Sequence, residues 1–248
     1  MTTSPATAKP RQSRFADQLE TDLNRMVNEQ FDSPEFKLLG QVPLTLKRAQ
    51  YYTVQLVFYA SNRRDCWAYV QARAPLDVKQ SIWRHEEDEL IKDSRAGADH
   101  ITLMNREAIA LGITEQDLAA AQPAPMIKAT SLAFSYIAST LPWLSALVSS
   151  HFLERRNNNS LLKSGKGSSV RWRDRLINEL KIDPAGLISS NVHSVADEEH
   201  SDLIWDTIQR HVTDEDSYKQ AVQGAREAQQ LDRAVRGALA TGMLMIPE

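Results

Sequence analysis

The sequence predicts an all-α protein, a single bundle of about seven to nine helices. Its 248 residues are enough to bury one sizeable core. Only nine glycines and ten prolines occur, and so few turn-forming residues disfavour a sandwich or barrel of many short strands. Apolar residues recur at helical spacing along almost the whole chain. With 42% apolar and 25% charged residues, the composition is typical of a globular protein rather than a disordered one.

The first half of the chain contains signals for three helices. Apolar residues lie on one face of the first helix: Phe15, Leu19, Leu23 and Met26. Ser33 and Pro34 are typical of the start of a short second helix, which Gly40 ends. A third helix is expected over residues 44–60, followed by a polar interruption at residues 62–65.

The middle of the chain predicts four more helices. Residues 76–94 form a segment dense in acids, and residues 99–111 form a second helical pattern. Thr114 and Asp117 resemble a capping pair for a short helix. A long uncharged helix is then expected over residues 129–156.

The last third of the chain begins with a basic segment, which follows the uncharged one. Residues 155–173 hold six basic residues and no acid. We interpret this segment as a basic loop or lid, because the helical patterns on both sides need each other for burial. Two helices follow, over about residues 191–212 and over residues 214–239 with Thr213 as cap.

Charge and apolar runs limit the expected partners and location. A net charge of −3 provides no basic excess, so we expect no nucleic-acid partner. Residues 1–13 lack the apolar core of a secretory signal and are expected to form a flexible tail before a helical domain at residues 14–248. The uncharged run at residues 129–150 could span a bilayer. Its many hydroxyl side chains and Pro142 favour a buried helix instead, so we expect a cytoplasmic protein without a membrane partner.

Two histidines and an aspartate on one predicted helix point to a metal site. His193, Asp197 and His200 follow i, i+4, i+7 spacing and therefore lie within about 60° of one another on one helical face. Two imidazoles and a carboxylate suit a divalent first-row metal. Cys66 is the single cysteine, which excludes thiolate-rich zinc and iron–sulfur sites and favours iron or manganese. The alternative interpretation is a solvated polar face.

Further ligands would come from other helices. Glu89 and His100 are eleven residues apart, a spacing that returns to the same face if the helix is continuous. Glu86 and Asp93 share a seven-residue repeat with His100 and remain alternatives to Glu89. Glu154 ends a helix otherwise free of charge, where a carboxylate needs a partner or solvent.

Taken together, these residues follow the order Glu, His, Glu, His-x-x-x-Asp-x-x-His on three helices. In this the sequence resembles the haem-oxygenase-like diiron oxidases and oxygenases, which are related to the helical thiaminase-II and pyrroloquinoline-quinone-synthase proteins. The resemblance runs from residues 36–40 through residues 49–52 to the second histidine of the motif. It implies six metal ligands: Glu89, His100, Glu154, His193, Asp197 and His200. A ferritin-like bundle would need two Glu-x-x-His pairs, which this chain lacks.

The resemblance implies an O₂-dependent enzyme on a haem-oxygenase-like bundle. It would hold two Fe(2+) ions per chain, with manganese as the other metal to consider, and would oxidise a small organic substrate. O₂ and that substrate are the expected partners, and the chain could form a homodimer. Because the basic segment follows Glu154, Arg155 and Arg171 are expected to bind the carboxylate of an amino acid or other carboxylic acid; a solvated loop is the alternative. The alternative function is a non-catalytic binding protein on the same scaffold.

Overall fold

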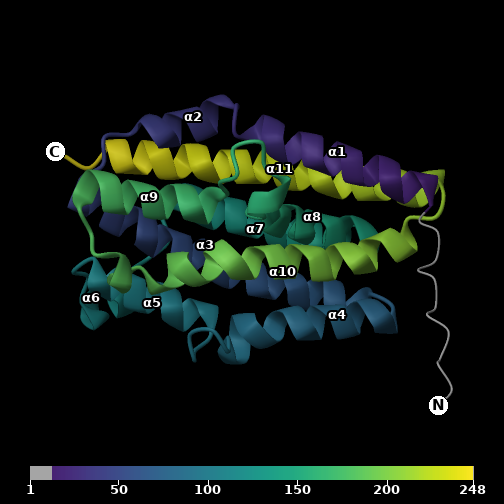
Figure 1. Ribbon diagram of the computed structural model, residues 1–248, viewed down its shortest axis with the longest axis horizontal. Coiled ribbons are helices and arrows are strands. Elements are labelled where there is room, and N and C mark those ends of the chain that lie inside the picture. Colours follow the sequence, from purple (N-terminus) through teal and green to yellow (C-terminus); the bar gives the residue numbers. More distant parts are fainter. Residues whose placement is uncertain (1–12, 248) are drawn as a thin grey trace, which may run out of the picture.

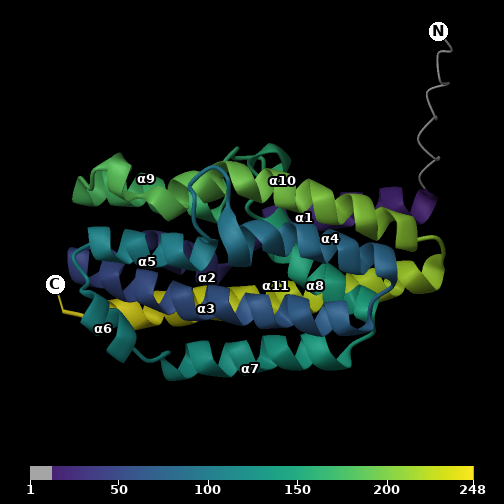
Figure 2. The ribbon, with the colours of Figure 1, turned by 90° about the horizontal axis from the view of Figure 1, so that it is seen from below.

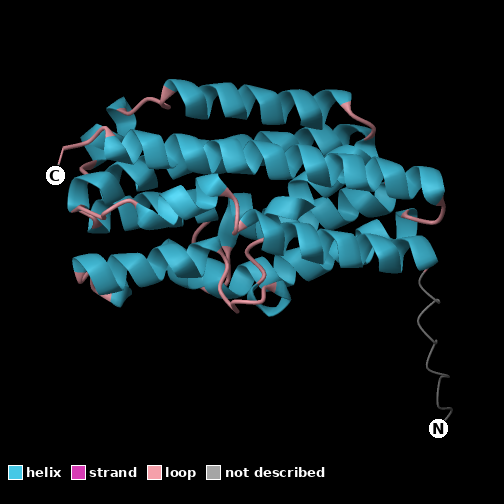
Figure 3. Cartoon of the chain, turned by 90° about the horizontal axis from the view of Figure 1, so that it is seen from above, coloured by secondary structure: helices cyan, strands magenta, loops and turns pink. Residues whose placement is uncertain are grey.

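The computed structural model describes residues 13–247, and these form α-helices joined by short loops, with no strand among them (Figures 1 and 3). The helices are α1 (Arg14–Gln30), α2 (Pro34–Gln41), α3 (Leu46–Arg73), α4 (Leu76–Glu87), α5 (His100–Ala110), α6 (Glu115–Ala120), α7 (Pro125–Thr140), α8 (Trp143–Arg155), α9 (Ser168–Leu180), α10 (Ile188–His211) and α11 (Glu215–Leu244). The predicted all-α class is confirmed. The eleven helices exceed the predicted seven to nine. The tail predicted for residues 1–13 lies outside the described residues, except that Ser13 caps α1.

The long helices run side by side along the longest axis of the molecule (Figures 1 and 2). Helix α8 lies inside the bundle, between α11 and α10, and every residue from Leu144 to Arg155 is buried. Helix α7 covers α3 at one edge, and α9 and α10 lie at the opposite edge in Figure 2. The lack of charge along most of α8 therefore follows from its central position, because a charged side chain there would need a buried partner.

The long uncharged segment forms two helices rather than one. Leu141 and Pro142 separate α7 from α8, and Leu141 has an extended backbone with ψ 159°. A proline inside a helix removes a backbone donor and pushes the preceding residue out of the helical region, which explains the break. No helix in the described part of the chain is long and apolar enough to cross a membrane.

The polar interruption predicted at residues 62–65 is wrong, because α3 continues through it to Arg73. Two of the polar side chains there have partners on other helices: Asn62 Nδ2 donates to Ser135 Oγ (2.8 Å) and Arg64 Nη1 to Glu86 Oε1 (2.8 Å). A run of polar residues is equally typical of an exposed loop and of a helix whose polar side chains have partners on neighbouring helices. Only the packing of α3 shows that the second case applies here.

The basic segment is part loop and part helix, since α9 begins at Ser168. The loop before it contains a 3₁₀ turn at Asn159–Leu161 and is fixed to two helices. The Asn28 side chain on α1 accepts from Lys163 N–H (2.8 Å) and donates to the Leu161 carbonyl (3.0 Å), while Asn159 Nδ2 donates to the Ser194 carbonyl on α10 (3.0 Å). The sequence analysis did not predict α9, because the basic residues of this segment are typical of a loop. The helix nevertheless buries Trp172 and Leu176.

Gly224 sets the approach of α11 to α8. A Cβ atom at this position would lie 1.9 Å from the Ser145 carbonyl oxygen, so Gly224→Ala must push the two helices apart. We expect a loss of about 2 kcal/mol in the free energy of unfolding, measured by chemical denaturation. Gly40→Ala is the control, because a Cβ there meets no atom within 4 Å. Equal stability of the Gly224→Ala variant and the wild type would contradict this close approach.

Candidate metal centre

Helix α4 ends in a turn of π-helix, and this turn presents Glu89 to the interior. The π-helical residues are Asp88–Lys92, and irregular turns of this kind are frequent at functional sites. The chain then reverses: Asp93 N–H donates to the Ala98 carbonyl (3.0 Å), and Gly97 has φ +74°. The helix is therefore not continuous between Glu89 and His100, in agreement with the two separate helices predicted here. The two residues meet across the reversal, where Glu89 Oε1 lies 3.0 Å from His100 Nδ1.

Four helices and the π-turn bring histidines and carboxylates together in two groups. Within each group, one candidate ligand atom per residue lies within 4.8 Å of the others. The first group is His85, Glu89, Glu154 and His200, and the second is Glu89, His100 and His193. Because Glu89 belongs to both groups, its carboxylate could contribute a ligand atom to each of them.

Each of the four histidine rings is held at one nitrogen by an acceptor outside these groups. The pairs are His85 Nδ1 with Glu86 Oε1 (2.9 Å), His100 Nε2 with Asp93 Oδ2 (2.8 Å), His193 Nδ1 with the Ser189 carbonyl (2.8 Å) and His200 Nε2 with Asp88 Oδ2 (3.2 Å). Carboxylates and carbonyls only accept, so these nitrogens carry the ring protons. Metal-binding histidines are typically oriented in this way, which leaves the other ring nitrogen to the metal.

The remaining ring nitrogens fit a metal site. His85 Nε2 is buried without a hydrogen-bond partner among the described residues, and the buried His100 Nδ1 lies 3.0 Å from Glu89 Oε1. His85 Nε2 lies 3.7 Å from Glu154 Oε1, and His200 Nδ1 lies 3.4 Å from Glu89 Oε1. A buried polar atom without a partner is costly. Divalent cations between these nitrogens and oxygens would satisfy them, and the nitrogen–oxygen donor set suits iron or manganese.

Arg64 balances part of the negative charge of the site. Its Nη1 atom lies 2.8 Å from both Glu86 Oε1 and Glu89 Oε2, and its Nη2 atom lies 3.9 Å from Glu154 Oε1. Burial raises the pKa of Glu86 to about 7, although the charge of Arg64 opposes this. Burial also acts to raise the pKa of Glu89, but Arg64 and His100 hold it well below its usual range. Glu89 is therefore ionised and ready to bind a cation.

Asp197 lies beside the two groups but belongs to neither. Its side chain is buried on the same face of α10 as the two histidines of the motif. Ser169 Oγ donates to its Oδ2 atom (3.3 Å), and its Oδ1 atom has no hydrogen-bond partner among the described residues. Burial and the charge of Glu154 raise the pKa of Asp197 to about 8. Its role as a metal ligand stays a prediction.

The structure thus brings together five of the six predicted ligands: Glu89, His100, Glu154, His193 and His200. The alternatives Glu86 and Asp93 are hydrogen-bond partners of histidines instead. Sequence reasoning did not select His85. The signal was present, because His85 and Glu89 are four residues apart and adjacent turns of one helix bring such residues together.

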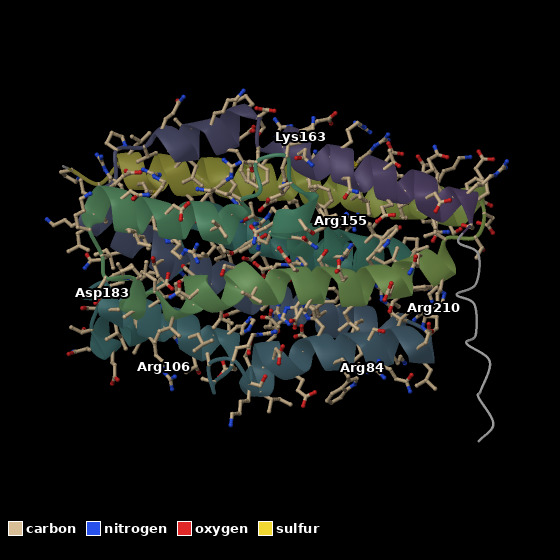
Figure 4. The ribbon with its side chains drawn as sticks, viewed as in Figure 1. Arg84, Arg106, Arg155, Lys163, Asp183 and Arg210 are labelled. Carbon is tan, nitrogen blue, oxygen red and sulfur yellow. The ribbon has the colours of Figure 1, made fainter. Side chains whose placement is uncertain are left out.

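A cavity of about 120 Å³ opens beside the candidate ligands, between α3, α5, α8, α9, α10 and α11. Neither Arg155 nor Arg171 lines it, so the structure does not bring them to this cavity, and their role in substrate binding stays a prediction. Arg155 Nε donates to Asn24 Oδ1 (3.0 Å), and the Arg171 guanidinium lies over the Phe31 ring at 4.6 Å. Consecutive helical residues point about 100° apart, which turns Arg155 away from Glu154. Figure 4 shows Lys163, another residue of the basic segment, on the α1 side of the bundle.

Comparison with known proteins supports this interpretation of the fold and site. Residues 50–233 match the model of a family described as iron-containing redox enzymes. Among solved structures, a domain of unknown function with a haem-oxygenase-like fold from Shewanella denitrificans has a TM-score of 0.73 at 14% identity, covering 92% of this chain and 93% of its own. A TenA homologue from Pseudomonas syringae has a TM-score of 0.66 at 11% identity, covering 98% of both chains. A CADD-like protein of unknown function from Nostoc punctiforme has a TM-score of 0.65 at 12% identity, covering 92% and 96%.

These likenesses establish a haem-oxygenase-like fold, and no curated protein matches the chain. A thiaminase-like hydrolysis would need a nucleophilic thiol. The thiol of Cys66 is buried on α3 and does not line the cavity, and burial raises its pKa. A thiolate is therefore not available where a substrate would bind.

Substitution of the shared carboxylate should affect metal binding more than substitution of one histidine. We expect Glu89→Ala to lower the iron content after anaerobic Fe(II) loading more than His193→Ala does, because only Glu89 contributes to both groups. Elemental analysis of the desalted protein measures this. His211→Ala is the control, since His211 also lies on α10 but contacts Asp77 instead. Full iron content in the Glu89→Ala variant would contradict the shared position.

The four rings differ in protonation before metal binds. Burial and a neighbouring imidazole lower the pKa of His85 to about 3 and that of His193 to about 4, so both rings are neutral at pH 7. Burial also opposes protonation of the other two rings. There, hydrogen bonds to carboxylates and the charge of Glu89 raise the pKa of His100 to about 9 and that of His200 to about 10. These two rings carry an extra proton in the metal-free protein.

Metal binding at pH 7 must displace these protons. We therefore expect the release of about two protons per chain and an affinity that rises about tenfold or more per pH unit between pH 6 and pH 8. Calorimetric Fe(II) titrations in buffers of different ionisation enthalpy measure the proton release. A binding enthalpy that does not depend on the buffer would contradict this expectation.

Proposed function

The chain belongs to the family of iron-containing redox enzymes, and from this membership we propose that it is a non-haem diiron oxidase or oxygenase. It would use O₂ to oxidise a small organic substrate in the buried cavity. The observation that carries this proposal is the pair of ligand groups that share Glu89, with every imidazole oriented by its own acceptor.

The two groups would each hold one ferrous ion. His85, Glu154 and His200 would bind the first, His100 and His193 the second, and Glu89 both. Asp197 offers a further carboxylate next to them. Mn(2+) accepts the same nitrogen and oxygen ligands and is the other metal to test.

A pair of ferrous ions supplies electrons and open coordination positions for the reduction of O₂. The protein's own residues fix where this occurs. Glu86, Asp88 and Asp93 hold three of the ring protons away from the ligand groups, so that the opposite nitrogens face inward. The side chains of Leu153 and Met104 line the cavity and exclude water from part of it.

The main alternative is a binding protein that kept the scaffold without turnover. Both functions share the fold, and they differ in the response to O₂. The oriented imidazoles favour the enzyme, because each ring is fixed at one nitrogen as metal-binding histidines typically are, and the buried His85 Nε2 would have no partner without a metal.

We expect about two Fe(II) ions per chain after anaerobic loading and consumption of O₂ on mixing. Stopped-flow absorption with a panel of small organic acids should show a transient visible band that one compound accelerates or suppresses. His85→Ala and His200→Ala should abolish the band and O₂ consumption, because each removes a member of the first group. His211→Ala is again the control. A fully loaded protein that consumes no O₂ with any compound would favour the binding protein.

A further inference from the structure

A second set of buried charges lines the cavity outside the ligand groups. Arg63 from α3, Arg156 after α8 and Arg236 from α11 are each 5% exposed or less and contribute to the cavity wall. Two of them, Arg156 and Arg236, contact one fully buried carboxylate, Asp232. Arg236 Nη2 lies 3.1 Å from Asp232 Oδ1, and Arg156 Nε lies 2.8 Å from Asp232 Oδ2. Arg236 also donates to the hydroxyl of Tyr52 (3.2 Å).

These positive charges exceed the negative charges available to them. Within residues 13–247, Arg63 has neither an ion pair nor a side-chain hydrogen bond, and its Nε and Nη2 atoms are buried without partners. Its guanidinium lies over the Phe134 ring at 4.9 Å, which offsets only part of the cost of burying a charge. The charge of Arg63 acts on Glu86 from a distance, but the acids of the ligand groups contact Arg64 and not Arg63. The site lacks an anion.

The surrounding wall indicates what kind of anion fits. Leu56, Met104 and Trp172 make other parts of the cavity apolar. Thr53 Oγ1 and Ser168 Oγ, which also line the cavity, are buried without hydrogen-bond partners. A small molecule with one anionic group and an apolar body matches this combination.

The position of the arginines relates this anion to the candidate ligands. Arg63 and Arg156 line the same cavity as Glu89, His100 and Glu154. A molecule held by its anionic end at the arginines therefore occupies the same cavity as the ligand groups.

We propose that Arg63, with Arg156 beside it, binds the carboxylate of an organic acid in this cavity. A planar guanidinium with free N–H groups can form a bidentate pair with a carboxylate. Arg236 has a supporting role, because it holds Asp232, which in turn orients Arg156. That this acid is the substrate rests on the function proposed above. The carboxylic acid expected from the sequence would then be recognised by the arginines that line the cavity rather than by Arg155 and Arg171.

The test compares a carboxylate with its neutral analogue. Hexanoate, hexanamide and inorganic phosphate are titrated calorimetrically into the full chain, both metal-free and loaded anaerobically with Fe(II). We expect hexanoate to bind at least tenfold more tightly than hexanamide, and phosphate to bind no better than hexanamide. Equal affinities for hexanoate and hexanamide, or preferential binding of phosphate, would overturn the proposal.

Substitutions identify the residue responsible. Arg63→Met should weaken hexanoate binding at least tenfold without lowering the Tm, because it removes a buried charge that lacks a partner. Arg63→Lys should keep part of the affinity for hexanoate. It provides a second variant with a changed side chain at this position if Arg63→Met does not fold. Arg106→Met is the control, since Arg106 is exposed on the outer side of α5 (Figure 4). Unchanged hexanoate affinity in both Arg63 variants would refute the assignment.

Iron content, measured on the same samples, separates this proposal from the preceding one. Hexanoate binding by a chain that takes up no iron would remove the diiron function and leave the carboxylate site. Iron uptake without hexanoate binding would leave the diiron function and remove the carboxylate site. Loss of hexanoate binding in Arg63→Met with unchanged iron content is the result we expect.

Discussion

The burial of Glu89 among imidazoles is the constraint that the surrounding bundle satisfies. An ionised carboxylate far from water requires compensating charge and fixed partners. Arg64 supplies one positive charge, and His100 and His200 supply two more in the metal-free protein. The acceptors behind the rings prevent the imidazoles from turning away. The π-helical turn, the chain reversal after it and the inward face of α10 are all arranged around this one side chain.

Helix α8 shows how the fold places charged residues beside the site within a buried helix. It is buried from Leu144 to Arg155, so its charged residues occur only at its C-terminal end, where they have partners. Glu154 faces the ligand groups, while Arg155 turns to α1 and stacks over the Trp205 ring at 4.9 Å. Glu154 thus belongs to the candidate site, whereas its neighbour Arg155 stabilises the packing of the bundle. The sequence alone does not show which of two adjacent charged residues faces the site.

The two buried charge sets divide the cavity into regions of opposite character. The ligand groups carry more carboxylates than arginines, and the set around Asp232 carries more arginines than carboxylates. The excess of arginines is costly in the empty protein and would be relieved by an anion, whereas the extra protons of His100 and His200 balance the carboxylates of the ligand groups until a cation displaces them. Stability given up in this way is common where binding is required. Cations and an organic anion would therefore bind in neighbouring regions without competing for the same side chains.

The sequence by itself determined the helical class and several helix limits, and its resemblance to a known family singled out five residues of the candidate site. Periodic apolar residues and capping signals are local, and i, i+4, i+7 spacing places side chains on one face whatever the helix packs against. Only the tertiary structure decided that His85 joins the ligands, that Asp197 lies beside them and that Arg63 rather than Arg155 lines the cavity. These facts depend on how α3, α4, α8 and α10 are rotated about their axes. That rotation is set by long-range packing, which no local pattern encodes.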